Sequence, residues 1–115
     1  MTDESFPQKM NRDWDEAVTS GEQRKDNMHA LEWLAEFYRQ QDPEGRRLAD
    51  AVLSDWLLSN DHRRRFGALA VIREYQLRQT LPALRELAEK LETDSEPIAP
   101  YDWQKVNLLI ADLSK

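Results

Sequence analysis

The chain has no cysteine and only three glycines among its 115 residues. Without cysteine it can form no disulfide, has no thiolate nucleophile and cannot build a zinc–thiolate site, so a cytoplasmic location is the simplest expectation. No apolar run approaches the roughly 20 residues that a membrane-spanning helix needs. The N-terminal segment is polar and acidic and lacks the apolar stretch of a signal peptide. The 40% apolar and 33% charged residues are typical of an all-helical protein.

Side chains of catalytic type are also scarce. The chain has two histidines, His29 and His62, and neither belongs to a metal-binding pattern. The nearest approach is Asp26, three residues before His29, and one such pair is a weak signal. No nucleophile motif surrounds a serine. The sequence therefore predicts no metal, no cofactor and no enzymatic activity.

The sequence does contain apolar residues at three- to four-residue spacing, which predicts helices along most of the chain. The clearest pair lies in residues 61–91, where Asp61 can cap the first helix and Pro82 suits the first turn of the second. The apolar stripes of this pair are Phe66, Leu69 and Ile72, then Leu81, Leu84, Leu87, Ala88 and Leu91.

Further helices are expected at about residues 11–20, 22–41, 46–59 and 101–113. Gly21 is expected to break or bend the first of them. We expect residues 1–10 to be flexible and residues 11–115 to form a single domain. Trp33 and Trp103 are expected in its core.

The helices also repeat. A shift of 38 residues pairs Met28 with Phe66 and Leu34 with Ile72, and a two-helix unit of about 40 residues is the period of a helical solenoid. In these positions the sequence resembles the HEAT-like repeats. The resemblance implies a short, right-handed α-solenoid of five or six helices, stacked as antiparallel hairpins, whose surface binds proteins or sometimes nucleic acid. The residues that carry it are Arg64, Arg65, Ala68, Leu69, Ile72, Leu81, Pro82, Ala83, Leu84, Leu87, Ala88 and Leu91, with Val106, Leu108, Leu109 and Ile110 in a partial third unit.

Charge is distributed unevenly along the chain. The net charge of −6 divides into −6 for residues 1–45, +4 for residues 46–85 and −4 for residues 86–115. Non-specific nucleic-acid binding needs a dominant positive field, so this pattern disfavours it. The acidic flanks favour a basic protein partner, which they would attract at long range.

The candidate partner-binding residues are acidic side chains with neighbouring aromatic anchors, because tryptophan is frequent in binding hot spots. The alternatives are an ordinary solvated face for the acids and a core position for Trp14 and Trp56. The set comprises Asp13, Trp14, Asp15, Glu16, Asp55, Trp56, Asp94, Glu96, Tyr101 and Asp102.

A second candidate site is basic. Its side chains could hold a phosphate or an acidic partner. The alternative is a structural role, because the residues begin two predicted helices and have acids nearby. The set comprises Arg46, Arg47, His62, Arg63, Arg64 and Arg65.

These patterns lead to one expected function and two alternatives. We expect a non-catalytic acidic inhibitor that blocks a basic, nuclease-like toxin, because the chain looks similar to small acidic bacterial immunity proteins. One alternative is an adaptor or regulatory subunit whose basic middle contacts an acidic protein. The other is phosphate or nucleic-acid binding through Arg63, Arg64 and Arg65.

Overall fold

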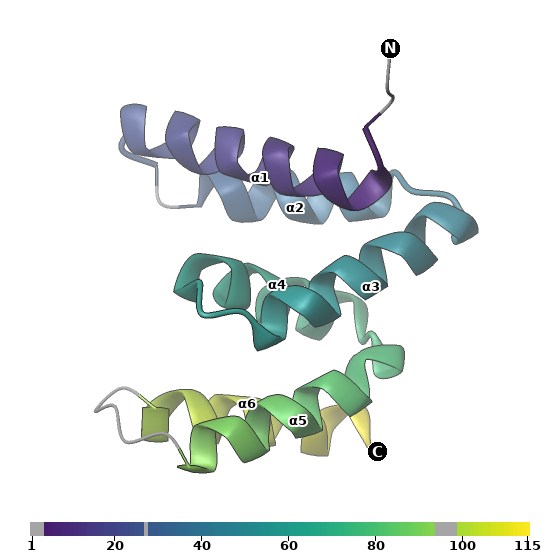
Figure 1. Cartoon of the computed structure of the whole chain (residues 1–115), viewed down its shortest axis with the longest axis vertical. Coiled ribbons are helices and arrows are strands. Elements are labelled where there is room, and N and C mark those ends of the chain that lie inside the picture. The colour runs from purple at the N-terminus through teal and green to yellow at the C-terminus, as the bar shows by residue number, and fades with distance from the viewer. Residues whose placement is uncertain (1–3, 27, 94–98) are drawn as a thin grey trace. The chain divides into compact units, whose positions relative to one another are not determined.

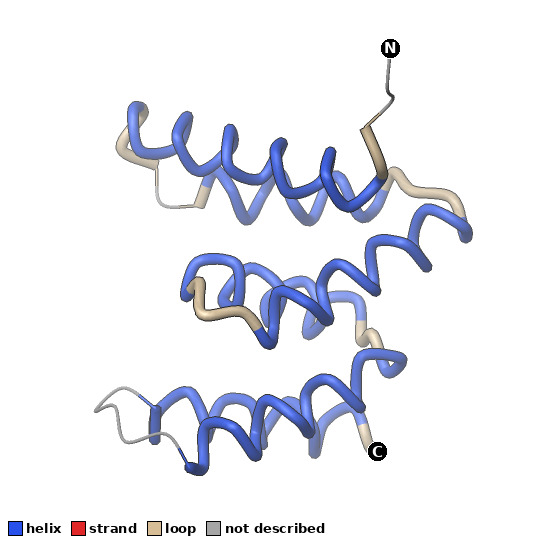
Figure 2. Tube along the Cα trace, in the orientation of Figure 1, coloured by secondary structure: helices blue, strands red, loops and turns tan. Residues whose placement is uncertain are grey.

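The computed structural model describes residues 4–26, 28–93 and 99–115, of which residues 99–102 by their backbone alone. Every element in these ranges is helical, which confirms the all-α class and the expected number of helices (Figure 2). The chain divides into two compact units, Met1–Val52 and Leu53–Lys115. The HEAT-like stacking and the single domain remain predictions. The elements are α1 (Phe6–Gln23), α2 (His29–Arg39), α3 (Pro43–Leu58), α4 (His62–Tyr75), the 3-10 turn η1 (Arg78–Thr80), α5 (Leu81–Thr93) and α6 (Ala99–Leu113) (Figure 1).

Helix α1 begins at Phe6, five residues before the expected start at Asn11. A capping box fixes this start. The Gln8 backbone N–H donates to the Ser5 hydroxyl at 3.3 Å, and the Ser5 N–H donates to the Gln8 side-chain oxygen at 3.1 Å. Residues 6–10 are therefore part of the helix, and Met10 is fully buried.

The expected break at Gly21 is wrong, because α1 continues through this residue to Gln23. The chain turns instead after Arg24, with Lys25 in the left-handed conformation at a φ of 55°. The connection returns closely over Gly21, whose carbonyl accepts from the Asp26 N–H at 2.9 Å. A Cβ at Gly21 would lie 2.9 Å from the Asp26 carbonyl oxygen. Glycine is thus required here for close approach of the backbone, not for ending the helix.

The first unit is held together by helices α1 and α2, which lie side by side (Figure 1). Phe37 contributes to the pair through its ring. The ring stacks on Trp33, with 5.1 Å between ring centres, and its centre lies 5.9 Å from that of Phe6. The Tyr38 hydroxyl donates to Asp50 of α3 at 2.9 Å, which satisfies a phenol that is otherwise buried. The core of this unit consists of Met10, Trp14, Ala17, Leu34, Tyr38, Ala49 and Val52.

In the second unit, helices α5 and α6 pack along each other and η1 leads into α5 (Figure 1). The expected stripe of α5 is confirmed at Leu84, Leu87 and Leu91, which are buried. Val106 and Leu113 of α6 are buried as well. The core positions of the unit are Leu53, Trp56, Leu57, Ala68, Val71, Ile72, Leu77, Leu84, Leu87, Leu91, Val106, Leu109 and Leu113.

The expected stripe of α4 is confirmed at Ile72 but wrong at Phe66. Phe66 is 53% exposed, whereas Arg65 is 6% exposed and Ala68 and Ile72 are fully buried. Successive residues of a helix are separated by about 100°, so burial of Arg65 turns Phe66 away from the core. Trp103, also expected in the core, is 38% exposed.

The capping box generates the first prediction. The Ser5→Ala variant should lower the free energy of unfolding by about 1 kcal/mol, because the Gln8 backbone N–H in the first turn of α1 loses its acceptor. Lys9→Ala, an exposed substitution in the same region, should change it by less than about 0.5 kcal/mol. Urea unfolding followed by circular dichroism measures both. Equal values for the two variants would contradict a helix start at Phe6.

Candidate functional site

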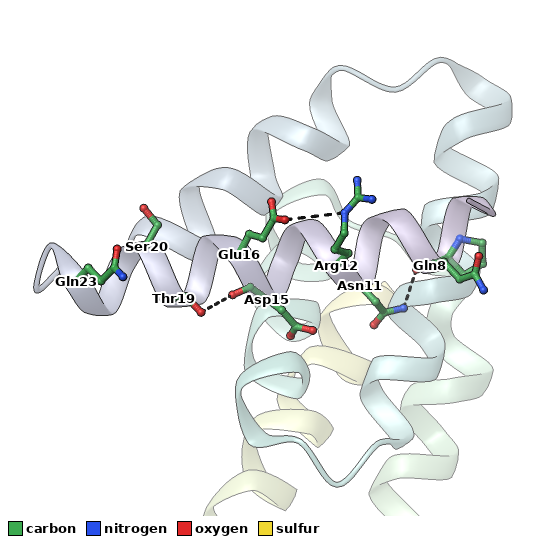
Figure 3. A pocket seen from close by; sticks show the side chains of 9 residues that line it. Gln8, Asn11, Arg12, Asp15, Glu16, Thr19, Ser20 and Gln23 are labelled. Atoms are coloured by element: carbon green, nitrogen blue, oxygen red, sulfur yellow. Dashed lines mark hydrogen bonds and ion pairs between the residues drawn. The ribbon is translucent and has the colours of Figure 1, made fainter. Parts of the chain in front are cut away.

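The expected acidic surface lies partly on the outer face of α1. Asp15 and Glu16 are exposed and line a shallow surface along the helix (Figure 3). Asp13 is half-buried and accepts from Arg12 at 3.3 Å. Arg12 also lies 4.0 Å from Glu16 and pairs with Glu4, so one cation partly neutralises this acidic row.

The two tryptophans of the acidic set do not lie at the surface. Trp14 is 2% exposed and Trp56 is 3% exposed, so their rings fill the cores of their units and cannot serve as exposed anchors. This confirms the alternative in which both residues are core. Asp55 is exposed on α3, but it lies in the second unit while Asp15 and Glu16 lie in the first.

The remaining acidic candidates fall in the last part of the chain. Asp94 and Glu96 lie outside the described residues. Tyr101 and Asp102 lie in the first turns of α6, where only the backbone is described. Their proposed role in binding remains a prediction.

The basic cluster at the start of α4 is divided between the surface and the interior. Arg65 is buried and donates to the Ser59 carbonyl at 2.9 Å. The Arg64 guanidinium pairs with Asp61 at 2.8 Å and lies 5.9 Å from the centre of the Trp56 ring. Both arginines therefore support the fold locally, as the structural alternative predicted. His62 and Arg63 are exposed.

The other two basic candidates, Arg46 and Arg47, lie near the start of α3 in the first unit and also have local contacts. Arg46 lies over the Tyr38 ring at 5.4 Å and donates to the Arg39 carbonyl at 3.3 Å. Arg47 pairs with Glu44 at 2.6 Å, and its hydrogen bond lowers the pKa of this carboxyl below its ordinary value. The six basic candidates are thus divided between the two units.

Asp61 caps helix α4. Its carboxylate accepts from the backbone N–H groups of Arg63 at 3.0 Å and Arg64 at 3.2 Å. Partial burial raises the pKa of Asp61, but the two backbone hydrogen bonds and the Arg64 guanidinium outweigh burial and hold the pKa below its usual range. The expected cap at Asp61 is confirmed.

A groove between helices α4 and α6 was not expected from the sequence. It has a volume of about 630 Å³ and lies wholly within the second unit. Its exposed large apolar side chains are Phe66, at 53%, and Leu108, at 72%. The lining from α4 is Phe66, Leu69, Ala70 and Arg73, and the lining from α6 is Lys105, Leu108, Leu109, Ala111, Asp112 and, just past the helix end, Lys115.

The charged residues of this groove are mainly basic, in a chain whose net charge is −6. Its cations are Arg73, Lys105 and Lys115, and its one acid is Asp112. Lys105 places its ammonium 5.7 Å from the centre of the Phe66 ring. Asp112 is engaged by two neighbours: it accepts from the Gln76 amide at 3.1 Å and lies 3.8 Å from the Lys115 ammonium.

The apolar surface continues along α6 beyond the groove. Trp103 and Leu108 border a second hollow of about 350 Å³. Four large apolar side chains are strongly exposed among the described residues, and three of them, Phe66, Trp103 and Leu108, lie on α4 and α6. The fourth, Met28, lies in the first unit.

No three His, Asp or Glu side chains in residues 4–26, 28–93 and 103–115 are grouped to hold a metal ion. No helix in the described part of the chain is both long and apolar enough to span a bilayer. Comparisons with protein families, with curated proteins and with solved structures found no match.

The Asp61 cap generates a prediction on pH. Because its folded-state pKa is lowered, charged Asp61 stabilises the fold above the ordinary aspartate value of about 4, and this contribution is lost as pH falls through the lowered value. Asp61→Asn keeps a capping oxygen without the charge, so it should be less stable than the wild type at neutral pH. The difference should shrink as pH falls below about 4.

Urea unfolding of both proteins across this pH range measures the effect. Asp61→Ala serves as the control for the cap itself, because it removes the acceptor and should cost about 1 kcal/mol at neutral pH. A difference between the wild type and Asp61→Asn that stays constant down to about pH 2 would rule out a stabilising charge on Asp61.

Proposed function

We propose that the protein is a non-catalytic protein-binding module and that its binding surface is the groove between α4 and α6. The observation that carries this proposal is the pair of exposed side chains Phe66 and Leu108 at that groove. Full burial of one such side chain would contribute about 1.5–3 kcal/mol of favourable free energy, which is lost while the side chain stays in water. Clustered exposed apolar residues with a polar border are typical of interaction surfaces.

The form of the groove favours a protein over a small molecule. A small-molecule site usually surrounds its ligand and directs a few fixed polar groups at it. Here the lining consists of the exposed faces of two helices, and the polar groups are long side chains such as Arg73 and Lys105. Such an arrangement matches the surfaces on which proteins lay an amphipathic segment.

A second candidate function is the acidic inhibitor of a basic, nuclease-like toxin, similar to bacterial immunity proteins. Its support is the charge of the first unit. Residues 1–52 contain 12 acids and 7 bases, a net charge of −5, whereas residues 53–115 contain 10 acids and 9 bases, a net charge of −1. Exposed Asp15 and Glu16 would face a basic partner, whose approach such a charge accelerates.

Two further features accompany both candidates. The close packing of α1 with α2 and of α5 with α6 supports a HEAT-like arrangement of helical hairpins. The lack of cysteine in the sequence supports a cytoplasmic location.

Site-specific photo-crosslinking in the producing cells tests the groove. A photoreactive amino acid in place of Leu108 should give a covalent adduct with a protein, because a partner would cover this side chain. The same amino acid in place of Met28, which is 53% exposed in the first unit, is the matched control and should give none. No adduct from position 108, or equal adducts from both positions, would refute a binding surface at the groove.

Calorimetry with the nuclease domain of a toxin encoded beside the gene tests the inhibitor. A one-to-one complex is expected, with loss of nuclease activity. Asp15→Asn combined with Glu16→Gln should weaken it about tenfold, since two acids at the interface would be lost. Glu86→Gln combined with Glu89→Gln removes the same charge from exposed positions of α5 and should leave affinity unchanged. Equal losses of affinity for the two double variants would exclude the α1 face as the binding surface. The absence of any complex would exclude the inhibitor function.

A further inference from the structure

The side chains that line the groove form two parallel sets along their helices. Phe66, Leu69, Ala70 and Arg73 occupy positions i, i+3, i+4 and i+7 of α4, which is one face of a helix. Lys105, Leu108, Leu109 and Asp112 repeat the same spacing on α6. Each set extends about 11 Å along its helix axis, or two turns.

A surface built from two such helix faces is suited to a third helix. Side-chain ridges of one helix pack into the grooves of another, and an amphipathic partner helix presents anchors at i, i+3, i+4 and i+7. Leu108 is 72% exposed and Phe66 is 53% exposed, so a partner helix would cover both side chains at once.

The charges around the groove select the type of helix. Arg73 on α4 and Lys105 and Lys115 on the α6 side place three cations around the apolar lining. The single acid, Asp112, is already engaged by Gln76 and Lys115. With Asp112 counted, the three cations leave the lining with a net charge of +2, so it would repel a basic partner and attract acidic side chains beside an apolar stripe.

From this shape and charge, and resting on the binding surface proposed above, we infer that the groove binds an amphipathic helix with acidic residues flanking its apolar stripe. The second unit has a net charge of only −1, so its long-range repulsion of an acidic segment is small. The sequence offers, as an alternative, an acidic partner for the basic residues 46–85. Such a partner would contact the second unit through Arg73 and the residues around it.

Two designed peptides test this inference against the full-length protein. Each is blocked at both ends, has about 15 residues and carries leucines at i, i+3, i+4 and i+7. One has glutamate beside the leucine stripe and the other has lysine at the same positions. Fluorescence anisotropy of the labelled peptides should show at least about tenfold tighter binding of the glutamate peptide, and added salt should weaken it.

Variants of the protein locate the contact. Leu108→Gln and Arg73→Glu should each weaken binding of the glutamate peptide about tenfold. Met28→Gln is the control for an exposed apolar residue, and Arg85→Glu on α5 is the control for charge in the same unit. Neither control should change affinity. All four residues are exposed, so the variants are expected to fold.

Four outcomes would overturn the inference. The lysine peptide could bind as tightly as the glutamate peptide, or Leu108→Gln could leave affinity unchanged. Light scattering could instead show a dimer that Leu108→Gln dissociates, which would make a second copy of the chain the occupant. A protein crosslinked at position 108 despite failure of both peptides would leave the binding module standing and reject only the acidic helix.

Discussion

The second unit depends on how the end of helix α3 is satisfied. The last carbonyls of a helix lack intrahelical partners and carry its negative dipole end. Here two cationic side chains from other helices donate hydrogen bonds to carbonyls at this end of α3. The Lys90 ammonium of α5 donates to the Leu58 carbonyl at 3.3 Å, and Arg65 of α4 donates to the Ser59 carbonyl at 2.9 Å. Arg65 therefore points inward, and this fixes the rotation of α4 about its own axis.

The exposed position of Phe66 follows from that rotation. With Arg65 inside, Ala68 and Ile72 face the core, and Phe66 and Arg73 come to lie on the groove. The contact that closes the α3–α4 connection thereby also creates the apolar surface on which the proposed function rests. The proposed acidic inhibitor would instead use the α1 face, where Arg12 already partly neutralises Glu16. The two candidate surfaces differ in unit, in charge and in apolar content.

Much of the fold follows from the sequence, and the exceptions have physical reasons. The stripes of α5 and α6 are predictable because leucine and valine recur there without a competing phase. The start of α1 was also readable, since Ser5 and Gln8 have the spacing of a capping box. The buried face of α4 was not predictable, because an arginine is rarely buried. Ile72 also belongs to either stripe, the one with Phe66 and the one with Arg65. The groove could not be predicted from the sequence, because apolar periodicity does not show which helices are neighbours.

The Lys105 ammonium over the Phe66 ring has a consequence for the speed of association. A partner that covers Phe66 has to share the ring with this ammonium or displace it. Displacement requires only rotation about side-chain bonds, which in exposed residues takes picoseconds to nanoseconds. No backbone movement has to precede contact, so the on-rate would be that of an ungated encounter, about 10⁵–10⁷ M⁻¹s⁻¹. Differences in affinity among partners would then be expressed as differences in residence time.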